Sequence, residues 1–313
     1  MSRLIATRII SMALAIFTVL TLLFFGIRLG VGDPTTSIQG TYATAESLAA
    51  LHEALGLDRP LWQQYLSYIA GLLRGDLGVS LQNGQSVLTQ IIAVVPYTLD
   101  LTIGGLLIGI VLGVPLGFIS AVRRNAALDH VIRILTLSGV SIPAFIMGYF
   151  LIMIFTIGLG LFPVAGGGEL DEPASRLRYL FLPALSLGLI MTSYITRLTR
   201  TTVLEILTKD FIRTAHAKGL DRNTILRRHV LRLSLVTIVT LVGLYATITV
   251  GSAVVIETVF SRPGVGRLIV GAVAQRDYMV VQGAIIFYAA FVGLINLLID
   301  ITYPIIDPRI RYE

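Results

Sequence analysis

The stretch Asp210-Phe-Ile-Arg-Thr-Ala-His-Ala-Lys-Gly-Leu-Asp221 is a polar, basic island between long apolar runs of the chain. Its residues favour a short helix, with Asp210 as a reasonable cap at the start and Gly219 as a natural stop. A second, strongly basic helix over residues 223–232 is expected to follow and to run into the next apolar run. An ordinary basic loop would explain the charge, but it would not explain two helix-forming segments on either side of Gly219.

The composition places the rest of the chain in a membrane. Of the 313 residues, 55% are hydrophobic and only 13% are charged, and the mean hydropathy is +0.84. A soluble domain carries roughly 25% charged residues. The chain has a net charge of +6. In membrane proteins an excess of lysine and arginine usually lies in the cytoplasmic loops, so we do not interpret this charge as a sign of nucleic-acid binding. The absence of cysteine excludes disulfides, a thiol nucleophile and a thiolate metal site.

Six uncharged runs, each long enough to cross a bilayer as a helix, predict an all-α integral membrane protein with six transmembrane helices. The first run is too long for the core of a signal peptide, so we expect it to be retained. The third is too long for one crossing, and its helix is expected to end between Gly158 and Pro163. The six runs are residues 9–27, 101–122, 134–168, 179–196, 233–256 and 278–299.

Lysine and arginine are concentrated in alternate loops, which predicts that both termini are cytoplasmic. The segment 197–232 alone holds nine basic and three acidic residues. The predicted organisation is a first transmembrane helix over 1–30, an extracytoplasmic segment over 31–97, a five-helix core over 98–304 and a cytoplasmic tail over 305–313. Within 31–97 we expect short amphipathic helices over 45–55 and after Asp58-Arg-Pro60. These helices either pack on the bundle as a lid or receive a soluble partner.

Small residues recur at a spacing of four in the second run, which predicts a helix face that another helix approaches closely. Pro115 and Pro143 are positions where spans two and three can kink. Close packing and hinging are both open interpretations of this pattern. The small residues are Gly105, Gly109, Gly113 and Gly117.

No catalytic constellation is recognisable, and no Gly-rich phosphate loop is present, so we do not expect the chain to be an enzyme or to bind ATP. Carboxylates are nearly absent from span centres, which argues against an ion-coupled secondary carrier. Asp100, Glu257, Asp277 and Asp300 fall at predicted span ends, where we expect them to reach water. The fifth run is rich in hydroxyl groups, which either line an aqueous translocation path or satisfy helix–helix hydrogen bonds. The candidate path residues are Tyr245, Thr247, Thr249 and Ser252.

The segment Arg213-Thr-Ala-His-Ala-Lys-Gly219 resembles the EAA loop of bacterial ABC importer permeases in its peptide-permease variant. Further motifs extend the resemblance to essentially the whole chain, which is similar to the B-type permease of dipeptide, oligopeptide and nickel importers. The additional matches are Gly75-Asp-Leu-Gly78, Val95-Pro-Tyr-Thr98, Ser141-Ile-Pro143, Leu182-Pro-Ala184, Val255-Ile-Glu-Thr-Val-Phe-Ser-Arg-Pro-Gly-Val-Gly266, Arg276-Asp-Tyr278, Gln282-Gly283 and Asp307-Pro-Arg309.

This resemblance implies a type I ABC importer permease in the bacterial inner membrane, importing di- and oligopeptides or related solutes by alternating access. Its implied partners are a C-type second permease subunit, two ATP-binding subunits, an extracytoplasmic solute-binding protein and membrane lipid. The chain itself would need no cofactor or metal, because the partner subunits bind ATP. The resemblance implies that the EAA loop is a coupling helix that docks on the ATPase. The implied docking residues are Asp210, Arg213, Thr214, Ala215, Ala217, Lys218 and Gly219.

Two positions depart from the family pattern. Arg213 stands where the general family has glutamate, as is usual in the peptide branch. Thr237 stands where a proline is common, so the fifth helix is expected to enter the membrane straighter. A secondary active transporter and a non-transporting membrane scaffold are the alternative functions. The substrate stays open among dipeptides, longer peptides, glutathione, nickel chelates and sugars.

Overall fold

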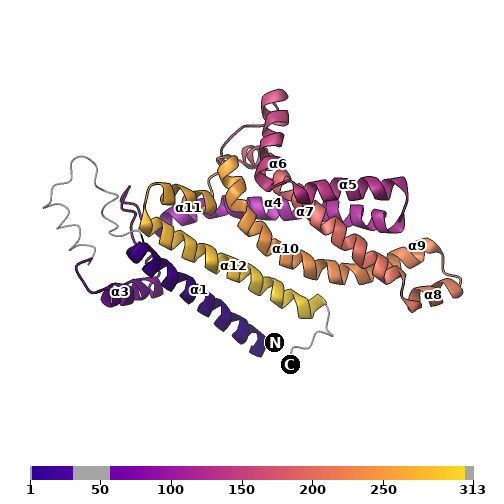
Figure 1. Ribbon diagram of the computed structural model, residues 1–313, viewed down its shortest axis with the longest axis horizontal. Coiled ribbons are helices and arrows are strands. Elements are labelled where there is room, and N and C mark those ends of the chain that lie inside the picture. Colours follow the sequence, from indigo (N-terminus) through magenta and orange to yellow (C-terminus); the bar gives the residue numbers. More distant parts are fainter. Residues whose placement is uncertain (1, 31–56, 307–313) are drawn as a thin grey trace. The chain divides into compact units, whose positions relative to one another are not determined.

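The computed structural model describes residues 2–30 and 57–306, and within these ranges the regular structure is helical apart from one isolated β-bridge between Val79 and Ser86 (Figure 1). The predicted helix over 45–55 and the Asp307-Pro-Arg309 motif lie outside the described residues. The helices are α1 (Ser2–Gly30), α3 (Leu61–Leu73), α4 (Val87–Val122), α5 (Ala127–Ser141), α6 (Ala144–Leu151), the π-helix η2 (Ile152–Gly158), α7 (Pro173–Leu207), α8 (Asp210–Ala217), α9 (Arg222–Thr224), the π-helix η3 (Ile225–Leu231), α10 (Arg232–Val259), α11 (Val265–Ala274) and α12 (Tyr278–Ile306).

The predicted membrane-spanning character is confirmed. Four helices among the described residues are long and apolar enough to cross a membrane, and two bent helix pairs raise the number to six. Each of the six runs identified in the sequence overlaps one of these candidate spans, and the third run extends past the end of its span at Gly158. The expected end of the third helix near Gly158 is also confirmed, because η2 ends at that residue.

The third span is broken rather than merely kinked. Helices α5 and α6 meet at an angle of 106° across Ile142 and Pro143. Ile142 adopts an extended conformation, as expected for a residue before proline, whose ring disfavours helical geometry at the preceding position. Pro143 then serves as the N-cap of α6. Pro115, by contrast, lies inside α4, which continues as one helix.

The fifth span bends beyond Thr237, which lies within the first of its two segments. The segments Arg222–Thr240 and Tyr245–Val259 are inclined by 52°. Gly243 lies between the two segments, and glycine is a common position for a helix bend. A Cβ atom at Gly243 would lie 2.5 Å from Ile299 Cγ2, so a larger residue would not fit here.

The described residues form two compact units. The first is drawn from Met1–Pro96 and Pro263–Leu294, and the second from Tyr97–Arg262 and Ile295–Glu313. In the first unit, α4 packs through Val87 and Ile91 against apolar side chains of α11 and α12. Helix α1 buries Phe24 against the rings of Tyr65 and Tyr68 on α3. The predicted helix after Asp58-Arg-Pro60 is therefore confirmed as α3.

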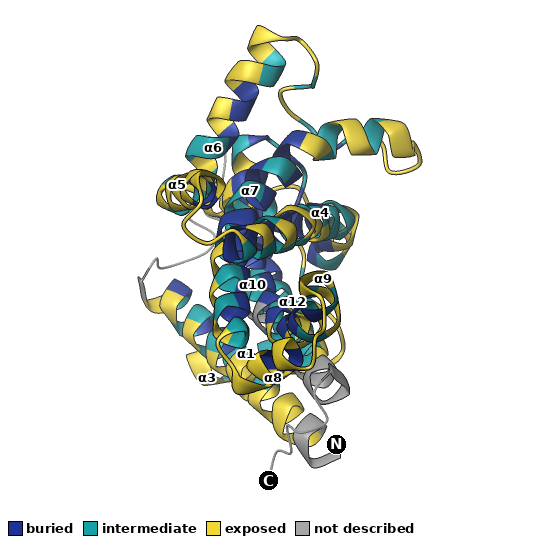
Figure 2. Ribbon diagram, turned by 90° about the vertical axis from the view of Figure 1, so that its right-hand side faces the viewer, coloured by how far each residue is buried: buried dark blue, intermediate teal, exposed yellow. Residues whose placement is uncertain are grey.

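The core of the second unit is centred on α7, which carries a long series of buried residues (Figure 2). The glycine stripe of α4 lies directly against α7. A Cβ atom at Gly109 would lie 2.5 Å from Met191 Cβ, and one at Gly113 would lie 2.8 Å from Ile195 Cβ. Only glycine permits this approach, so the prediction of close helix packing on this face is confirmed.

Candidate functional site

The polar island folds as the short helix α8, which rests on the chain through two small or apolar side chains. Ile212 and Ala215 are buried and belong to a cluster with Val203 of α7 and with Ile225 and Val230 of η3. The four-residue periodicity of a helix then leaves the opposite face of α8 exposed. Helix α8 is thus held by α7 and η3 and presents one polar face to solvent.

The end of α8 is defined by a Schellman motif. Leu220 N–H donates to the carbonyl of Ala215 at 3.2 Å, and Gly219 N–H donates to the carbonyl of His216 at 2.9 Å. Gly219 has φ +77°, the left-handed conformation that this motif requires. A Cβ atom there would meet no atom within 4 Å. Within this chain, the constraint on Gly219 is therefore the backbone conformation and not steric crowding.

The start of α8 differs from the expectation. Lys209 occupies the N-cap position and Asp210 is the first helical residue, so Asp210 does not cap the helix through its side chain. Its carboxylate instead lies 3.4 Å from the Arg213 guanidinium, with the two side chains 95% and 79% exposed. An acidic residue in the first turn still suits the positive end of the helix dipole.

Most of the predicted docking residues lie together on the exposed surface of α8 and its C-terminal turn. Ala215 is the exception, because it lies on the buried face of α8. Sequence reasoning missed Phe211 and Leu220, two apolar side chains that flank this surface with 44% and 39% exposure. The sequence feature that could have identified them is that they are apolar residues within a basic segment. The exposed docking residues are Asp210, Arg213, Thr214, Ala217, Lys218 and Gly219.

A short turn after α8 leads into an unbroken helical segment that enters the fifth span. The Asp221 carboxylate accepts a hydrogen bond from Thr224 N–H at 3.1 Å and so caps α9. The hydrogen bonds from Thr224 lower the pKa of Asp221 below its ordinary value. Helix α9 passes directly into η3 and then into α10. The predicted basic helix after Gly219 is confirmed, with the addition that Ile225–Leu231 within it is π-helical.

The candidate path residues on α10 point in different directions. Thr249 is buried, with its hydroxyl against Met191 S at 3.0 Å and the Tyr245 carbonyl at 2.8 Å. The ring of Tyr245 stacks on Tyr194 of α7. Thr247 instead contacts Asn296 of α12, while Ser252 donates to its own helix at the Ile248 carbonyl. The hydroxyls of Thr247, Thr249 and Ser252 therefore each have a hydrogen-bond partner within the chain.

The charged residues at the span ends are more buried than expected. Glu257 and Arg262 are fully buried, and Asp277 is 3% exposed. The Asp277 carboxylate accepts a hydrogen bond from Ser80. Sequence position alone suggested access to water, but each group finds a partner that lies far away in the chain. The side chain of Asp300 lies outside the described residues.

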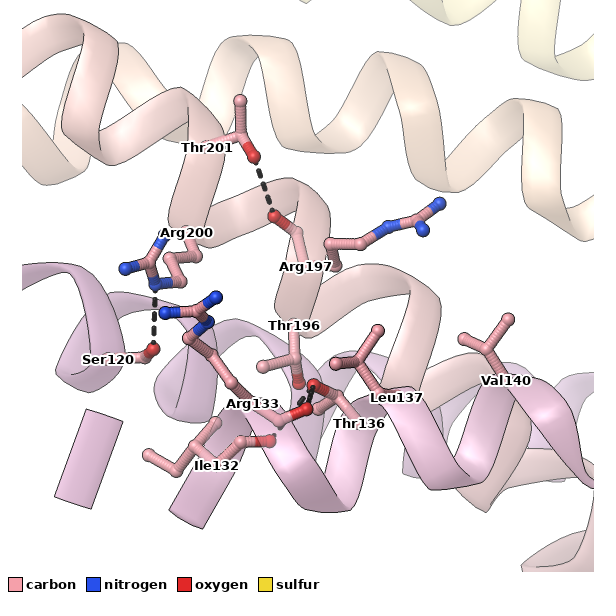
Figure 3. Close-up of a pocket in the computed structure, with 10 residues that line it drawn as sticks. All are labelled: Ser120, Ile132, Arg133, Thr136, Leu137, Val140, Thr196, Arg197, Arg200 and Thr201. Carbon is pink, nitrogen blue, oxygen red and sulfur yellow. Dashed lines mark hydrogen bonds between the residues drawn. The ribbon is translucent and has the colours of Figure 1, made fainter. Parts of the chain in front are cut away.

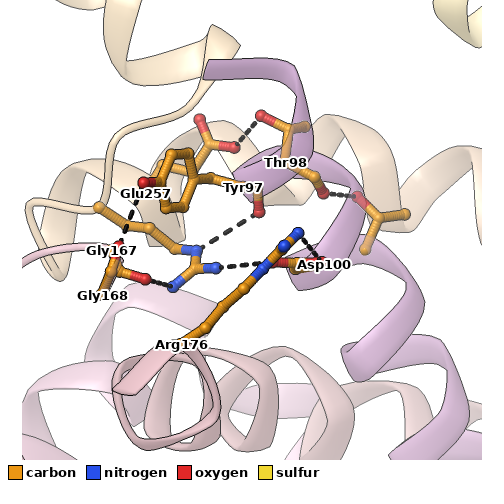
Figure 4. A network of polar contacts seen from close by, with 9 residues as sticks. Tyr97, Thr98, Asp100, Gly167, Gly168, Arg176 and Glu257 are labelled. Carbon is orange, nitrogen blue, oxygen red and sulfur yellow. Dashed lines mark hydrogen bonds and ion pairs between the residues drawn. The ribbon is translucent and has the colours of Figure 1, made fainter. Parts of the chain in front are cut away.

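In the second unit Arg262 belongs to a network of polar contacts with Asp100 and Arg176, and Figure 4 labels these last two residues together with Thr98 and Glu257. Asp100 binds Arg176 through two hydrogen bonds, one of 2.8 Å, and its Oδ2 lies 3.4 Å from Arg262 Nη2. Arg262 also donates to the Tyr97 carbonyl at 3.3 Å. Burial lowers the pKa of the Arg262 guanidinium, and the nearby Asp100 and Glu257 carboxylates oppose that shift. Thr98 donates to Glu257 at 2.6 Å.

Family models match nearly the entire chain. The model described as "Binding-protein-dependent transport system inner membrane component" matches residues 113–312. A second model, described as the N-terminal part of such a membrane component, matches residues 1–102. The two matches cover both compact units, and the first includes α8 with its docking residues.

Curated relatives match over nearly their full length. The chain is 38% identical to the di/tripeptide transport system permease protein DppB of Pseudomonas aeruginosa (strain UCBPP-PA14), with 95% of each chain covered. It is 35% identical to both the dipeptide transport system permease protein DppB and the glutathione transport system permease protein GsiC of Escherichia coli (strain K12), with 98% of each chain covered.

A solved structure shares the fold. A chain of the MetNI methionine ABC transporter, in an inward-facing conformation, matches with a TM-score of 0.59 and 21% identity. The match covers 70% of the present chain and 97% of that chain.

Proposed function

The chain belongs to the family of binding-protein-dependent transport system inner membrane components, and from this premise we propose that it imports short peptides. Members of this family are non-catalytic permease subunits of ABC importers, which act with an ATPase and a binding protein. The relatives at 35–38% identity are named for di- and tripeptides, dipeptides and glutathione. Because these substrates are all small peptides, the same class is proposed for this chain.

Helix α8 is proposed as the coupling helix that docks on the partner ATPase. The observation that carries this proposal is its exposed polar face, which ends in the left-handed Gly219 and is flanked by Phe211 and Leu220. An amphipathic helix of this kind is suited to a groove on another protein. Its exposed face holds basic residues, and the resemblance to the EAA loop points to the same docking set.

Force on α8 would reach the membrane through the contacts of Ile212 and Ala215. These side chains pack on α7 and η3, and η3 leads directly into α10. Alternating access would follow if the ATP-bound and ATP-free partners contact α8 differently, since only differential contacts can shift a conformational equilibrium. The proposed transporter contains two ATP-binding subunits and a C-type second permease, with membrane lipid around both permeases.

The burial of one α10 hydroxyl supports a smaller set of candidate residues for the proposed translocation path. Thr249 is 0% exposed and is better assigned to helix packing against α7. Tyr245, Thr247 and Ser252 are partly exposed, and they remain candidates for contact with substrate. The hydroxyls of Thr247 and Ser252 already have partners within the chain, so a passing peptide would have to share or replace those hydrogen bonds.

The coupling proposal is tested with the complete transporter in proteoliposomes. Gly219→Asn is the sharpest variant because asparagine tolerates the left-handed conformation. We expect it to abolish peptide-stimulated ATP hydrolysis and uptake of a labelled dipeptide, with an unchanged melting temperature. Gly219→Val would add backbone strain and should lower stability as well. Full coupling in the asparagine variant would overturn the docking role of this residue.

The proposed orientation places both termini and α8 in the cytoplasm. The chain contains no cysteine, so single-cysteine variants report without background. With a membrane-impermeant maleimide, Ser67→Cys on α3 should react from outside intact cells. Arg124→Cys should react only after the membrane is opened. Both positions are exposed, and the reverse labelling pattern would invert the topology.

A further inference from the structure

A cavity of about 220 Å³ opens between the end of α4, α5 and α7 in the second unit (Figure 3). This volume corresponds to several water molecules at about 30 Å³ each, so a phosphate group fits within it. Three arginines line the cavity, and no acidic side chain does so within residues 2–30 and 57–306. The lining residues are Ser120, Ile132, Arg133, Thr136, Leu137, Val140, Thr196, Arg197, Arg200 and Thr201.

Two of the three arginines that line the cavity have no ion pair among the described residues. Arg200 binds the buried Asp129 carboxylate through two hydrogen bonds of 2.9 Å. This pair accounts for the acidic group next to the cavity. The side chains of Arg133 and Arg197 have no ion-pair partner among the described residues. Figure 3 shows the guanidinium groups of Arg133 and Arg200 together, while Arg197 extends towards Leu137 and Val140.

One hydroxyl group in the wall is prepared to donate to a ligand. Thr196 is 1% exposed, lines the cavity, and its Oγ1 has no hydrogen-bond partner in the part of the chain that the structure describes. By contrast, Thr136 and Thr201 donate to carbonyls of their own helices at 2.9 and 3.1 Å. Because a hydroxyl has a single proton to donate, Thr196 is the threonine of this wall with a donor to spare. A buried donor without a partner is unfavourable and is relieved by an acceptor such as phosphate.

The arginines also mark a boundary in the chain. Arg133 ends the basic segment 123–133 and Arg197 begins the basic segment 197–232, so both lie where predicted spans meet predicted cytoplasmic loops. Leu137 lies one helical turn further along α5, on the apolar side of this boundary, and Val140 follows it. Lipid phosphates occupy this depth of a bilayer, and basic pockets between helices bind their headgroups.

We propose that this cavity binds the phosphate of an anionic phospholipid, with one acyl chain along Leu137 and Val140. Arg133 and the Thr196 hydroxyl would hold the phosphate through charge-assisted hydrogen bonds, and Arg197 would add positive potential at the mouth. Assignment to the cytoplasmic leaflet rests on the proposed topology. Binding itself does not depend on the ATPase or on transport, so the two proposals can fail separately.

The test titrates phosphatidylglycerol onto the delipidated complete transporter and counts bound lipid by native mass spectrometry. Arg133→Gln combined with Arg197→Gln should weaken binding about 30-fold, at about fivefold for each arginine. Thr196→Val removes a donor but keeps the side-chain shape. It should weaken binding about tenfold without lowering the melting temperature of the lipid-free protein. The charge-matched control is Arg123→Gln combined with Arg124→Gln, outside the cavity, and should bind normally.

Three results would overturn the proposal. Equal losses in the control and cavity double variants would indicate diffuse surface charge. Displacement of the lipid by millimolar inorganic phosphate or by a dipeptide would assign the cavity to a soluble anion or to the transported substrate. Equal binding of phosphatidylcholine would show that the anionic headgroup is not recognised.

Discussion

The second unit contains two arginine–aspartate pairs that differ in their exposure to solvent. Arg262 is fully buried beside Asp100 and also donates to backbone carbonyls. Arg213 and Asp210 on α8 form a single contact of 3.4 Å in almost complete exposure to solvent. A buried pair that loses one member leaves an uncompensated charge, whereas an exposed pair exchanges its partner for water at little cost. The first arrangement fastens helix ends, and the second remains available for a partner protein.

The strongest way to break this comparison is to remove Arg262. Arg262→Gln should destabilise the protein by about 3–5 kcal/mol, because the buried Glu257 carboxylate loses this nearby cation and Asp100 keeps only Arg176. Thermal unfolding of the detergent-solubilised protein measures the effect. Arg178→Gln, at an exposed position two residues after Arg176, is the control. If the two variants melted alike, the network would have no structural role.

The glycine seam between α4 and α7 should give the next largest effect. Gly109→Ala places a Cβ atom 2.5 Å from Met191 Cβ, so overpacking should cost about 1–3 kcal/mol. Gly251→Ala on α10 is the matched control, since its Cβ atom would meet nothing within 4 Å. That change should be neutral or stabilising by up to about 1 kcal/mol, because alanine favours helix. A lower melting temperature for both variants would contradict the conclusion that close packing of α4 against α7 requires glycine at position 109.

The exposed pair of α8 should separate stability from coupling. Arg213→Gln should alter the free energy of unfolding by no more than about 0.5 kcal/mol. We expect the same variant to reduce peptide-stimulated ATP hydrolysis in the complete transporter, because the guanidinium faces the proposed partner. Arg123→Gln, exposed in another predicted cytoplasmic loop, controls for lost charge. Normal coupling in Arg213→Gln would leave the basic face of α8 without a function.

The smallest and most local effect is expected at Asp221. Asp221→Ala should speed hydrogen exchange in α9, where the carboxylate caps Thr224, and Asp221→Asn should retain most of the protection. The pKa of Asp221 is lowered in the folded state, so its stabilising contribution is present at pH above the unfolded value. The contribution is lost only as the pH falls through the lowered pKa. At neutral pH, unchanged exchange in the alanine variant would refute the cap.

Much of this arrangement is encoded locally and could be predicted. The six runs follow from hydropathy, α3 from Pro60 and its apolar periodicity, and the end of α8 from Gly219. These features depend on residues within one or two helical turns of each other. The stripe from Gly105 to Gly117 also predicted a close helix neighbour, although nothing local identified α7 as that neighbour.

Long-range pairing is what the sequence concealed. Glu257 meets Thr98 from 159 positions away, and Arg262 meets Asp100 from 162 positions away. A charge at a span end looks solvated when its partner cannot be seen. The burial of Ala215 within the docking set is similar, because only the position of η3 decides which side of α8 faces inward. The 106° break at Pro143 was predictable in place but not in size.

The π-helix η3 has a mechanical consequence for the segment between α8 and α10. A π-helix bonds each N–H five residues back rather than four, so it packs more residues into the same length than an α-helix does. Rewinding the seven residues of η3 as an α-helix, at 1.5 Å per residue, would lengthen the segment while preserving backbone hydrogen bonds. The segment between α8 and α10 can therefore become longer when η3 changes from π-helix to α-helix. Tension on α8 would then be accommodated without loss of backbone hydrogen bonds.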